Sequence, residues 1–157
     1  DITPAIWEHD GTYSVIIKEN NYEVGSYCND SSVCPWRENG PYAMTQLNPE
    51  LKVEWRFTNT NTEECSRGTD GVVRCLPARK TGGFEWCINA PAVDGRGTVY
   101  ANSEDGNLYA IGQGGVEVGR FFLNLAIGAA YTPLSIGHDG RVYTENDGRM
   151  FAVGSGR

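Results

Sequence analysis

The chain has 157 residues, which is enough for one domain with a modest core. Its formal net charge of −7 argues against nucleic acid and anionic membrane surfaces as partners, because both attract basic patches. No apolar run reaches the roughly 18 residues that a transmembrane helix needs. The 20 glycines, the many aromatic residues and the scarcity of helix-forming runs predict an all-β protein.

The first part of the chain reads as strands interrupted by one long excursion. Residues 3–17 predict two strands around a turn at residues 9–11 (His-Asp-Gly), and residues 18–40 form a polar stretch rich in Asn, Ser and Cys. Strands resume over residues 41–57. The last of them alternates as an edge strand does, with one face formed by Val53, Trp55 and Phe57.

A second excursion covers residues 58–85, and two interpretations of it stay open. It is either an insertion between two repeated units, or it contains a degenerate extra unit built on residues 71–75 (Gly-Val-Val-Arg-Cys). We favour the insertion, because no Leu-Tyr-Ala-like phrase follows the Asp70-Gly71 turn as it does elsewhere in the chain.

The clearest hairpin signals lie in residues 90–112, which read APAVDGRGTVYANSEDGNLYAIG. Short apolar and β-branched runs alternate here with Asp-Gly turns, in which Gly accepts positive φ and Asp bonds its own backbone. A further strand is predicted over residues 116–123. The whole unit, residues 86–123, therefore predicts an antiparallel meander.

The same phrase recurs along the chain. Residues 132–154, TPLSIGHDGRVYTENDGRMFAVG, repeat it with Pro133 in the place of Pro91, and residues 3–15 open the chain in the same way. A repeat of roughly 40 residues that consists only of strands is typical of propeller blades.

With these motifs the chain resembles the pyrroloquinoline-quinone-like (PQQ-like) β-propeller repeat family. A blade of that family reads Pro-Ala-Val-Asp, Asp-Gly-Thr-Val-Tyr and Asp-Gly-x-Leu-Tyr-Ala-Leu, followed by a Trp near the outer strand, a place that Trp55 matches. The resemblance implies four-stranded antiparallel blades. It covers about two thirds of the chain and is unspecific for function, because the fold hosts dehydrogenases, assembly factors and binding domains alike.

The resemblance divides the chain into blades of one partial propeller over residues 1–157. They are residues 3–57 with the insertion 18–40, residues 86–123 after the insertion 58–85, and residues 131–157 without an outer strand. Three blades cannot close a ring, since propellers have about four to eight. We therefore expect a fragment whose partners are the remaining blades of a parent propeller or another copy of the chain. The start at Asp1, inside a blade phrase, is typical of a mature or truncated product.

The five cysteines favour an exported protein, periplasmic or extracellular. Cys28 with Cys34, and Cys65 with Cys75, are the disulfide candidates, because each pair brackets a loop-like segment that a bridge would pin. Zinc is the competing interpretation, but Cys-x-x-Cys is absent and His is scarce. Cys87 stays open: it is a buried thiol, pairs with a missing segment, or displaces one of these pairings.

The candidates for chemistry are weak. His9 and His138 occupy equivalent Asp-Gly turns, so both are predicted to face solvent. Acidic residues could gather around calcium, but Asp in such turns needs no ion, so no metal is predicted; these acids are Asp94, Glu104 and Asp105.

No catalytic residue is identified, and no cofactor is predicted, with PQQ and calcium as the open alternative. Quinoproteins of the family hold their cofactor near a Trp floor, a calcium ion and a catalytic Asp. No Trp of this chain lies in a phrase that matches that floor; the four are Trp7, Trp36, Trp55 and Trp86.

The insertions are the better candidates for binding, since loops on a rigid scaffold commonly carry specificity. The first holds residue types favoured at binding hot spots, namely Tyr22, Tyr27, Trp36 and Arg37. The second holds the densest basic cluster of the chain, formed by Arg67, Arg74, Arg79 and Lys80. The plain alternative is that both loops are simply polar and pinned by disulfides.

We therefore predict a non-catalytic exported scaffold or binding module that engages a protein or polysaccharide partner through its loops. The alternatives are a portion of a PQQ-dependent alcohol or sugar dehydrogenase, and a structural repeat of an extracellular assembly.

Overall fold

The structure, a computed structural model, describes residues 3–20, 41–78, 83–86, 90–124 and 134–154. Within these ranges the chain consists of strands, turns and connecting segments without any helix, which confirms the predicted all-β class. In the same ranges no helix exists that is long and apolar enough to cross a membrane.

The first sheet is a four-stranded antiparallel meander. Its strands are β1 (Ala5–His9), β2 (Thr12–Asn20), β3 (Tyr42–Leu47) and β4 (Val53–Thr58), and they lie side by side in chain order. Strand β2 continues through residues 18–20, which pair with the start of β3. The insertion predicted from residue 18 therefore begins only after Asn20, because the ladder to β3 holds these three residues extended.

The second sheet repeats this order. It is formed by β7 (Ala92–Val93), β8 (Val99–Asn102), β9 (Asn107–Gly112) and β10 (Val116–Phe122), again antiparallel neighbours in chain order. The predicted turn between β8 and β9 is present, and Gly106 there has a φ of 84°, a conformation that glycine adopts without strain.

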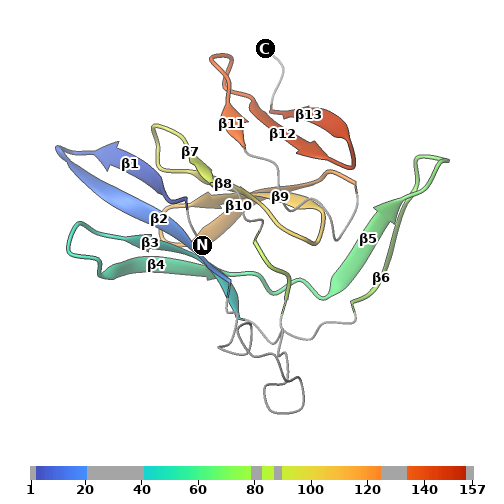
Figure 1. Cartoon of the computed structure of the whole chain (residues 1–157), viewed down its shortest axis with the longest axis horizontal. Coiled ribbons are helices and arrows are strands. Elements are labelled where there is room, and N and C mark those ends of the chain that lie inside the picture. Colours follow the sequence, from blue (N-terminus) through green and yellow to red (C-terminus); the bar gives the residue numbers. More distant parts are fainter. Residues whose placement is uncertain (1–2, 21–40, 79–82, 87–89, 125–133, 155–157) are drawn as a thin grey trace, which may run out of the picture.

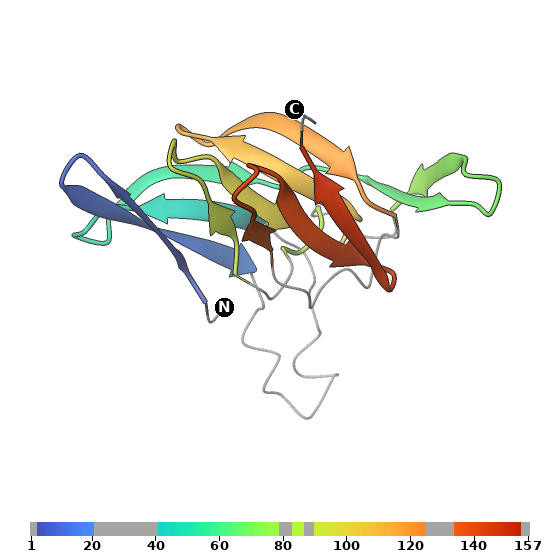
Figure 2. The ribbon, with the colours of Figure 1, turned by 90° about the horizontal axis from the view of Figure 1, so that it is seen from above.

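The third sheet has three strands among the described residues: β11 (Ser135–Ile136), β12 (Val142–Asn146) and β13 (Arg149–Val153). The first strands of the three meanders come together, because β7 contacts both β1 and β11. Figures 1 and 2 show β7 between these two strands and the three sheets set side by side. We call the junction of the first and second sheets the first seam, and that of the second and third sheets the second seam.

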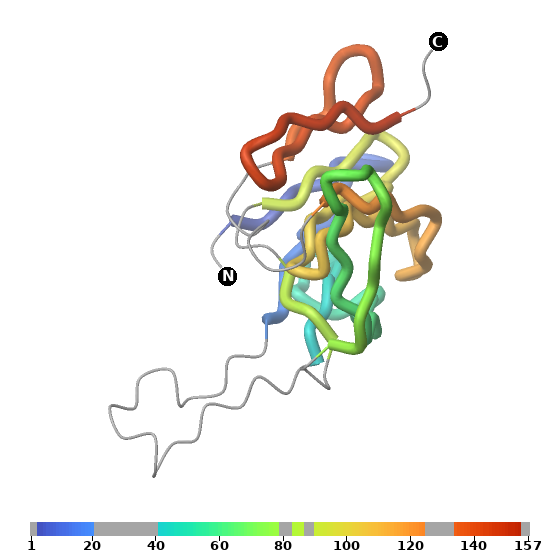
Figure 3. The backbone as a smooth tube through the Cα atoms, turned by 90° about the vertical axis from the view of Figure 1, so that its right-hand side faces the viewer, coloured from blue at the N-terminus to red at the C-terminus, as the bar shows by residue number. Residues whose placement is uncertain are grey.

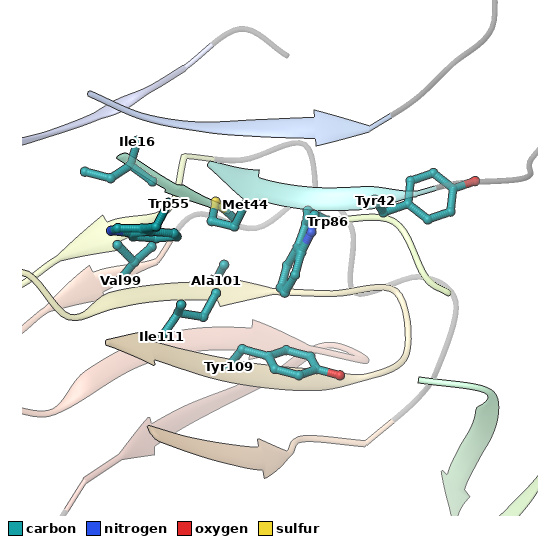
Figure 4. Packing of buried hydrophobic residues seen from close by; sticks show 9 residues of the cluster. All are labelled: Ile16, Tyr42, Met44, Trp55, Trp86, Val99, Ala101, Tyr109 and Ile111. Atoms are coloured by element: carbon teal, nitrogen blue, oxygen red, sulfur yellow. The ribbon is translucent and has the colours of Figure 1, made fainter. Parts of the chain in front are cut away.

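Buried side chains fill both seams. The larger cluster occupies the first seam (Figure 4) and consists of Ile16, Tyr42, Met44, Trp55, Trp86, Val99, Ala101, Tyr109 and Ile111. A smaller cluster of Leu108, Leu123 and Val142 belongs to the second seam, with Tyr100, Phe151 and Val153 packed against it. Alternation along each strand explains this arrangement, since every second residue of β2, β3 and β8 faces a neighbouring sheet.

A separate hairpin projects from this body. It comprises β5 (Glu63–Arg67) and β6 (Val73–Pro77), which pair only with each other among the described residues. Figures 1 and 2 show it extending beyond the sheets, and Figure 3 shows it from its own side of the molecule. The predicted Cys65–Cys75 disulfide joins the two strands where they face each other. We call residues 63–77 the arm. It is a hairpin and not a four-stranded unit, which favours the insertion interpretation.

Candidate binding surface

The arm exposes apolar side chains that nothing within the described chain covers. Every residue of β6 is exposed, and Val72, Val73 and Leu76 have 50%, 38% and 71% of their surface accessible. An isolated two-stranded hairpin is marginal in water. The disulfide stabilises the hairpin in place of packing, because it restricts the conformations that the unfolded hairpin can adopt.

The base of the arm is fixed to the second sheet by two asparagines. The Nδ2 atom of Asn59 donates to the Ser103 hydroxyl at 2.8 Å, and that of Asn61 donates to the Asp105 carboxylate at 3.0 Å. Asn59 and Asp105 are almost fully buried. These anchors were not foreseen, because both asparagines lie in a polar stretch that reads locally as a simple loop.

An ion pair forms within the arm, between Arg74 and Asp70, while the Arg67 guanidinium lies over the Phe122 ring of β10, 5.9 Å from its centroid. The Arg74 guanidinium binds both carboxylate oxygens of Asp70, at 3.1 and 2.6 Å. This fork lowers the pKa of Asp70 and raises that of Arg74.

Arg74 pairs with Ser66, and Arg67 pairs with Val73. These are successive pairs of the ladder, and side chains of successive pairs point to opposite faces, so the two arginines lie on opposite faces of the hairpin. The predicted basic cluster is therefore divided between the two faces. The exposed aliphatic side chains are divided too, since Leu76 shares the face of Arg74 and Val73 shares that of Arg67.

The other predicted loop residues lie outside the described residues. This applies to Tyr22, Tyr27, Trp36, Arg37, Arg79, Cys28 and Cys34, and to Cys87 and Lys80. Arg74 and the Cys65–Cys75 pair are thus the predicted site and disulfide residues that the structure places.

A hydrogen-bonded chain of His9, Ser14 and Glu54 lies at one end of the first seam. The His9 Nε2 atom lies 3.1 Å from Ser14 Oγ, and Ser14 donates its own proton to Glu54 Oε2 at 2.8 Å. Since the Ser14 proton is directed to Glu54, His9 must donate to Ser14 and is not its base. The triplet therefore links β1, β2 and β4 within the first sheet and lacks the arrangement of a serine nucleophile.

The prediction that both histidines face solvent is wrong for His9. His138 is exposed as expected, but the His9 side chain is only 22% exposed and stacks on Trp7 at 3.8 Å between ring centroids. The reason is that Trp7 and His9 lie two residues apart on β1 and share the face directed at the second sheet.

Two glutamines continue the polar contacts across the first seam. The Gln46 and Gln113 amides bind each other reciprocally at 2.9 and 3.0 Å, and Gln113 also donates to the Gly97 carbonyl. Gly97 has a φ of 80°, and a Cβ built there would lie 2.7 Å from the Trp7 ring. The close approach of this turn to β1 therefore requires glycine.

Two of the three acidic residues considered for calcium accept hydrogen bonds from the protein itself. Asp94 accepts the backbone N–H groups of Arg96 and Thr98 at 2.9 Å, as an Asx turn does. Asp105 accepts the N–H of Asn107 at 2.9 Å and the Tyr109 hydroxyl at 2.5 Å. Among the described residues, the one group with metal-ligand spacing is Glu63 with Cys65 and Cys75, and its two sulfurs are joined as a disulfide.

The contact between Tyr109 and Asp105 predicts a dependence of stability on pH. Burial, together with the Asp105 carboxylate, raises the pKa of Tyr109 well above its ordinary value of 10.0. The folded state therefore keeps the Tyr109 proton at pH values above about 10, where the unfolded chain loses it. The contribution of this tyrosine to the free energy of unfolding is therefore complete below about pH 10 and declines above it.

We expect the Tyr109→Phe variant to lack this decline. Between about pH 10 and 12, the free energy of unfolding of the wild type should fall more steeply than that of the variant, by about 1.4 kcal/mol per pH unit. Urea unfolding at a series of pH values measures the two slopes. Equal slopes would mean that Tyr109 titrates alike in the folded and unfolded states.

The described tryptophans do not offer an exposed ring face as a cofactor floor. Trp55 and Trp86 have 6% and 1% of their surface accessible, and Trp7 packs against the same cluster. Comparison with known proteins adds no assignment: no protein-family model matches the chain, and no curated protein matches it either. What the described residues define is an all-β protein of antiparallel meanders with a disulfide-bonded arm.

Proposed function

We propose that the chain is part of a PQQ-like β-propeller. Three observations support this: consecutive antiparallel meanders in the same strand order, Asp-Gly turns at matching places, and inner strands that meet where β7 contacts β1 and β11. On this proposal, each sheet is one blade and the seams are the junctions between blades.

We propose that its function is non-catalytic binding of a protein partner through the arm. The observation that carries this proposal is the exposure of aliphatic side chains on both faces of a hairpin that is anchored at its base and closed by a disulfide. Leu76 lies on one face, Val73 on the other, and Val72 directly before β6. Exposed aliphatic groups on a preorganised element bind at a low ordering cost. They favour a protein over a polysaccharide, since Arg74 is already held by Asp70.

The disulfide also supports an exported location, because such bonds persist in oxidising compartments. On this proposal the sheets act as the rigid support and the arm as the recognition element. The hydrogen bonds of Asn59 and Asn61 would fix the direction in which the arm points.

The test is photo-crosslinking from the arm, followed by measurement of affinity. A crosslinker placed at Ser66, an exposed residue on the same face of the hairpin as Leu76, should capture one protein from the exported fraction of the source cells. The captured protein, once purified, should bind the chain in solution. Leu76→Ser should weaken that binding by about tenfold or more, because an exposed Leu that is buried on binding contributes roughly 1.5–3 kcal/mol.

Met150→Ser is the matched control, since Met150 is 65% exposed on β13, outside the arm. It should leave the affinity unchanged. Equal losses for the two variants, or full binding by Leu76→Ser, would contradict the proposal. Dye-linked oxidation of alcohols or sugars after addition of quinone and calcium would instead establish the dehydrogenase alternative.

A further inference from the structure

Trp55 lies in the first seam, and its position can be followed along the row of paired residues that crosses the first sheet. Starting from Ala5, which follows Pro4, the pairs run across the first sheet from Ala5 to Ile16, from Ile16 to Gln46 and from Gln46 to Trp55. Trp55 is therefore the fourth-strand residue of the row that begins after the proline.

The same row in the second sheet ends on a glycine. Ala92, which follows Pro91, pairs with Tyr100, Tyr100 pairs with Ala110, and Ala110 pairs with Gly119. Gly119 thus occupies the register position that Trp55 occupies in the first sheet. Three of these positions, Tyr100, Ala110 and Gly119, line one groove.

The opposite walls of the two seams also correspond. In the first seam Trp55 clusters with Val99 and Ile111, which pair with each other across β8 and β9. In the third sheet Val142 and Val153 form the equivalent pair across β12 and β13. The valine–isoleucine pair that packs against the Trp55 indole in the first seam therefore has a counterpart in the second seam, the Val142–Val153 pair. No tryptophan occupies the corresponding position of the facing sheet there.

The second seam accordingly holds a groove where the first holds Trp55. Its volume is about 470 Å³, which falls in the range of small-ligand sites. The lining is predominantly apolar, and the Arg120 guanidinium is engaged elsewhere, with Glu117 and the Tyr109 ring. Besides Arg120, Ala152 and several glycines, the lining consists of Tyr100, Leu108, Ala110, Phe121, Val142 and Val153.

We propose that this groove binds a planar aromatic group of about indole size, presented by a small molecule and held between the Gly119 backbone and the Val142–Val153 pair. The chemistry of the ligand follows from the first seam, in which the same wall and row hold the indole of Trp55 with 6% of its surface exposed. This site is separate from the arm and does not depend on it.

Indole itself is the probe. We expect saturable shifts of the amide signals of Gly119, Ala110 and Val153 in heteronuclear NMR spectra, with a Kd of about 0.1–1 mM for a ligand of this size. Cyclohexanol, which is similar in size but not planar, should bind at least about fivefold more weakly.

Gly119→Trp should occupy the groove with its own side chain and abolish indole binding. A Cβ at Gly119 meets nothing closer than the Ala110 Cβ at 4.0 Å, and Gly119 does not have a positive φ, so the backbone accepts a side chain. Ala110→Leu narrows the same groove from β9 and should also weaken binding, which keeps the test valid if Gly119→Trp fails to fold. Val116→Trp, on the same strand at a residue 59% exposed, is the control and should bind indole normally.

Three outcomes would overturn the proposal. They are the absence of saturable shifts at these amides up to about 5 mM indole, equal affinity for cyclohexanol, and undiminished indole binding by both Gly119→Trp and Ala110→Leu. Since none of them involves the arm, failure here is distinguishable from failure of the arm as a binding element.

Discussion

Replacing Trp55 with alanine should lower the free energy of unfolding by about 3–5 kcal/mol, the range for removing a buried Trp or Phe side chain. Trp55 is 6% exposed and belongs to the cluster that joins the first sheet to the second. Its Nε1 atom also donates to Gln113 at 3.3 Å. The variant therefore loses apolar contacts and a cross-sheet hydrogen bond together. Urea unfolding followed by far-ultraviolet circular dichroism measures the loss.

Val53→Ala is the matched control for this prediction. Val53 lies on the same strand but is 52% exposed, so its truncation should cost less than about 0.5 kcal/mol. A loss below about 1 kcal/mol for Trp55→Ala would mean that the indole does not hold the first seam together.

Asp105→Asn should destabilise the protein by about 2–4 kcal/mol, because it places a donor against donors in a buried site. Asp105 has 0% of its surface accessible. One of its oxygens accepts from Asn107, and the other accepts from both Tyr109 and Asn61. If the new NH2 group takes the place of Oδ1, it meets the backbone N–H of Asn107, which cannot accept. If it takes the place of Oδ2, it meets the Asn61 amide, which can offer its oxygen only by releasing the Glu63 N–H. Equilibrium urea unfolding again provides the measurement.

The same change at Asp10 provides the control for charge. The Asp10 side chain is 97% exposed, and asparagine tolerates its φ of 49°. Asp10→Asn should leave the unfolding curve unchanged. Equal effects at the two positions would show that net charge, and not the buried hydrogen bonds of Asp105, determines the loss.

The local features of the fold could be predicted from the sequence, because they depend on neighbouring residues. Asp-Gly turns set the ends of strands, as at Gly106 and Gly148, which have φ values of 84° and 67°. The alternation of Val53, Trp55 and Phe57 correctly predicted a strand, but the prediction that all three share one face was wrong for Val53. β4 carries a bulge at Glu54, so Gln46 pairs with Trp55 while Leu47 pairs with Val53, which places Val53 on the opposite face from Trp55. That bulge turns the Glu54 carboxylate toward Ser14, which no local pattern indicates.

Contacts between sheets could not be predicted in the same way. The burial of His9, the anchoring of the arm by Asn61 and the groove beside Gly119 all depend on which sheet faces which, and at what register. Gly119 reads in the sequence as an ordinary strand glycine. That Gly119 occupies the position of Trp55 becomes visible only when the rows of paired residues in the two sheets are compared.

The three meanders share one strand order and meet at their first strands, and Trp55 fills the first seam. Nuclear Overhauser contacts in the folded protein test this arrangement most directly. We predict contacts from the Trp55 indole protons to the methyl groups of Val99 and Ile111, and from Ala92 in β7 to residues of both β1 and β11. Contacts of the Trp55 indole only within its own sheet, or a β7 that contacts neither β1 nor β11, would contradict this arrangement of the sheets.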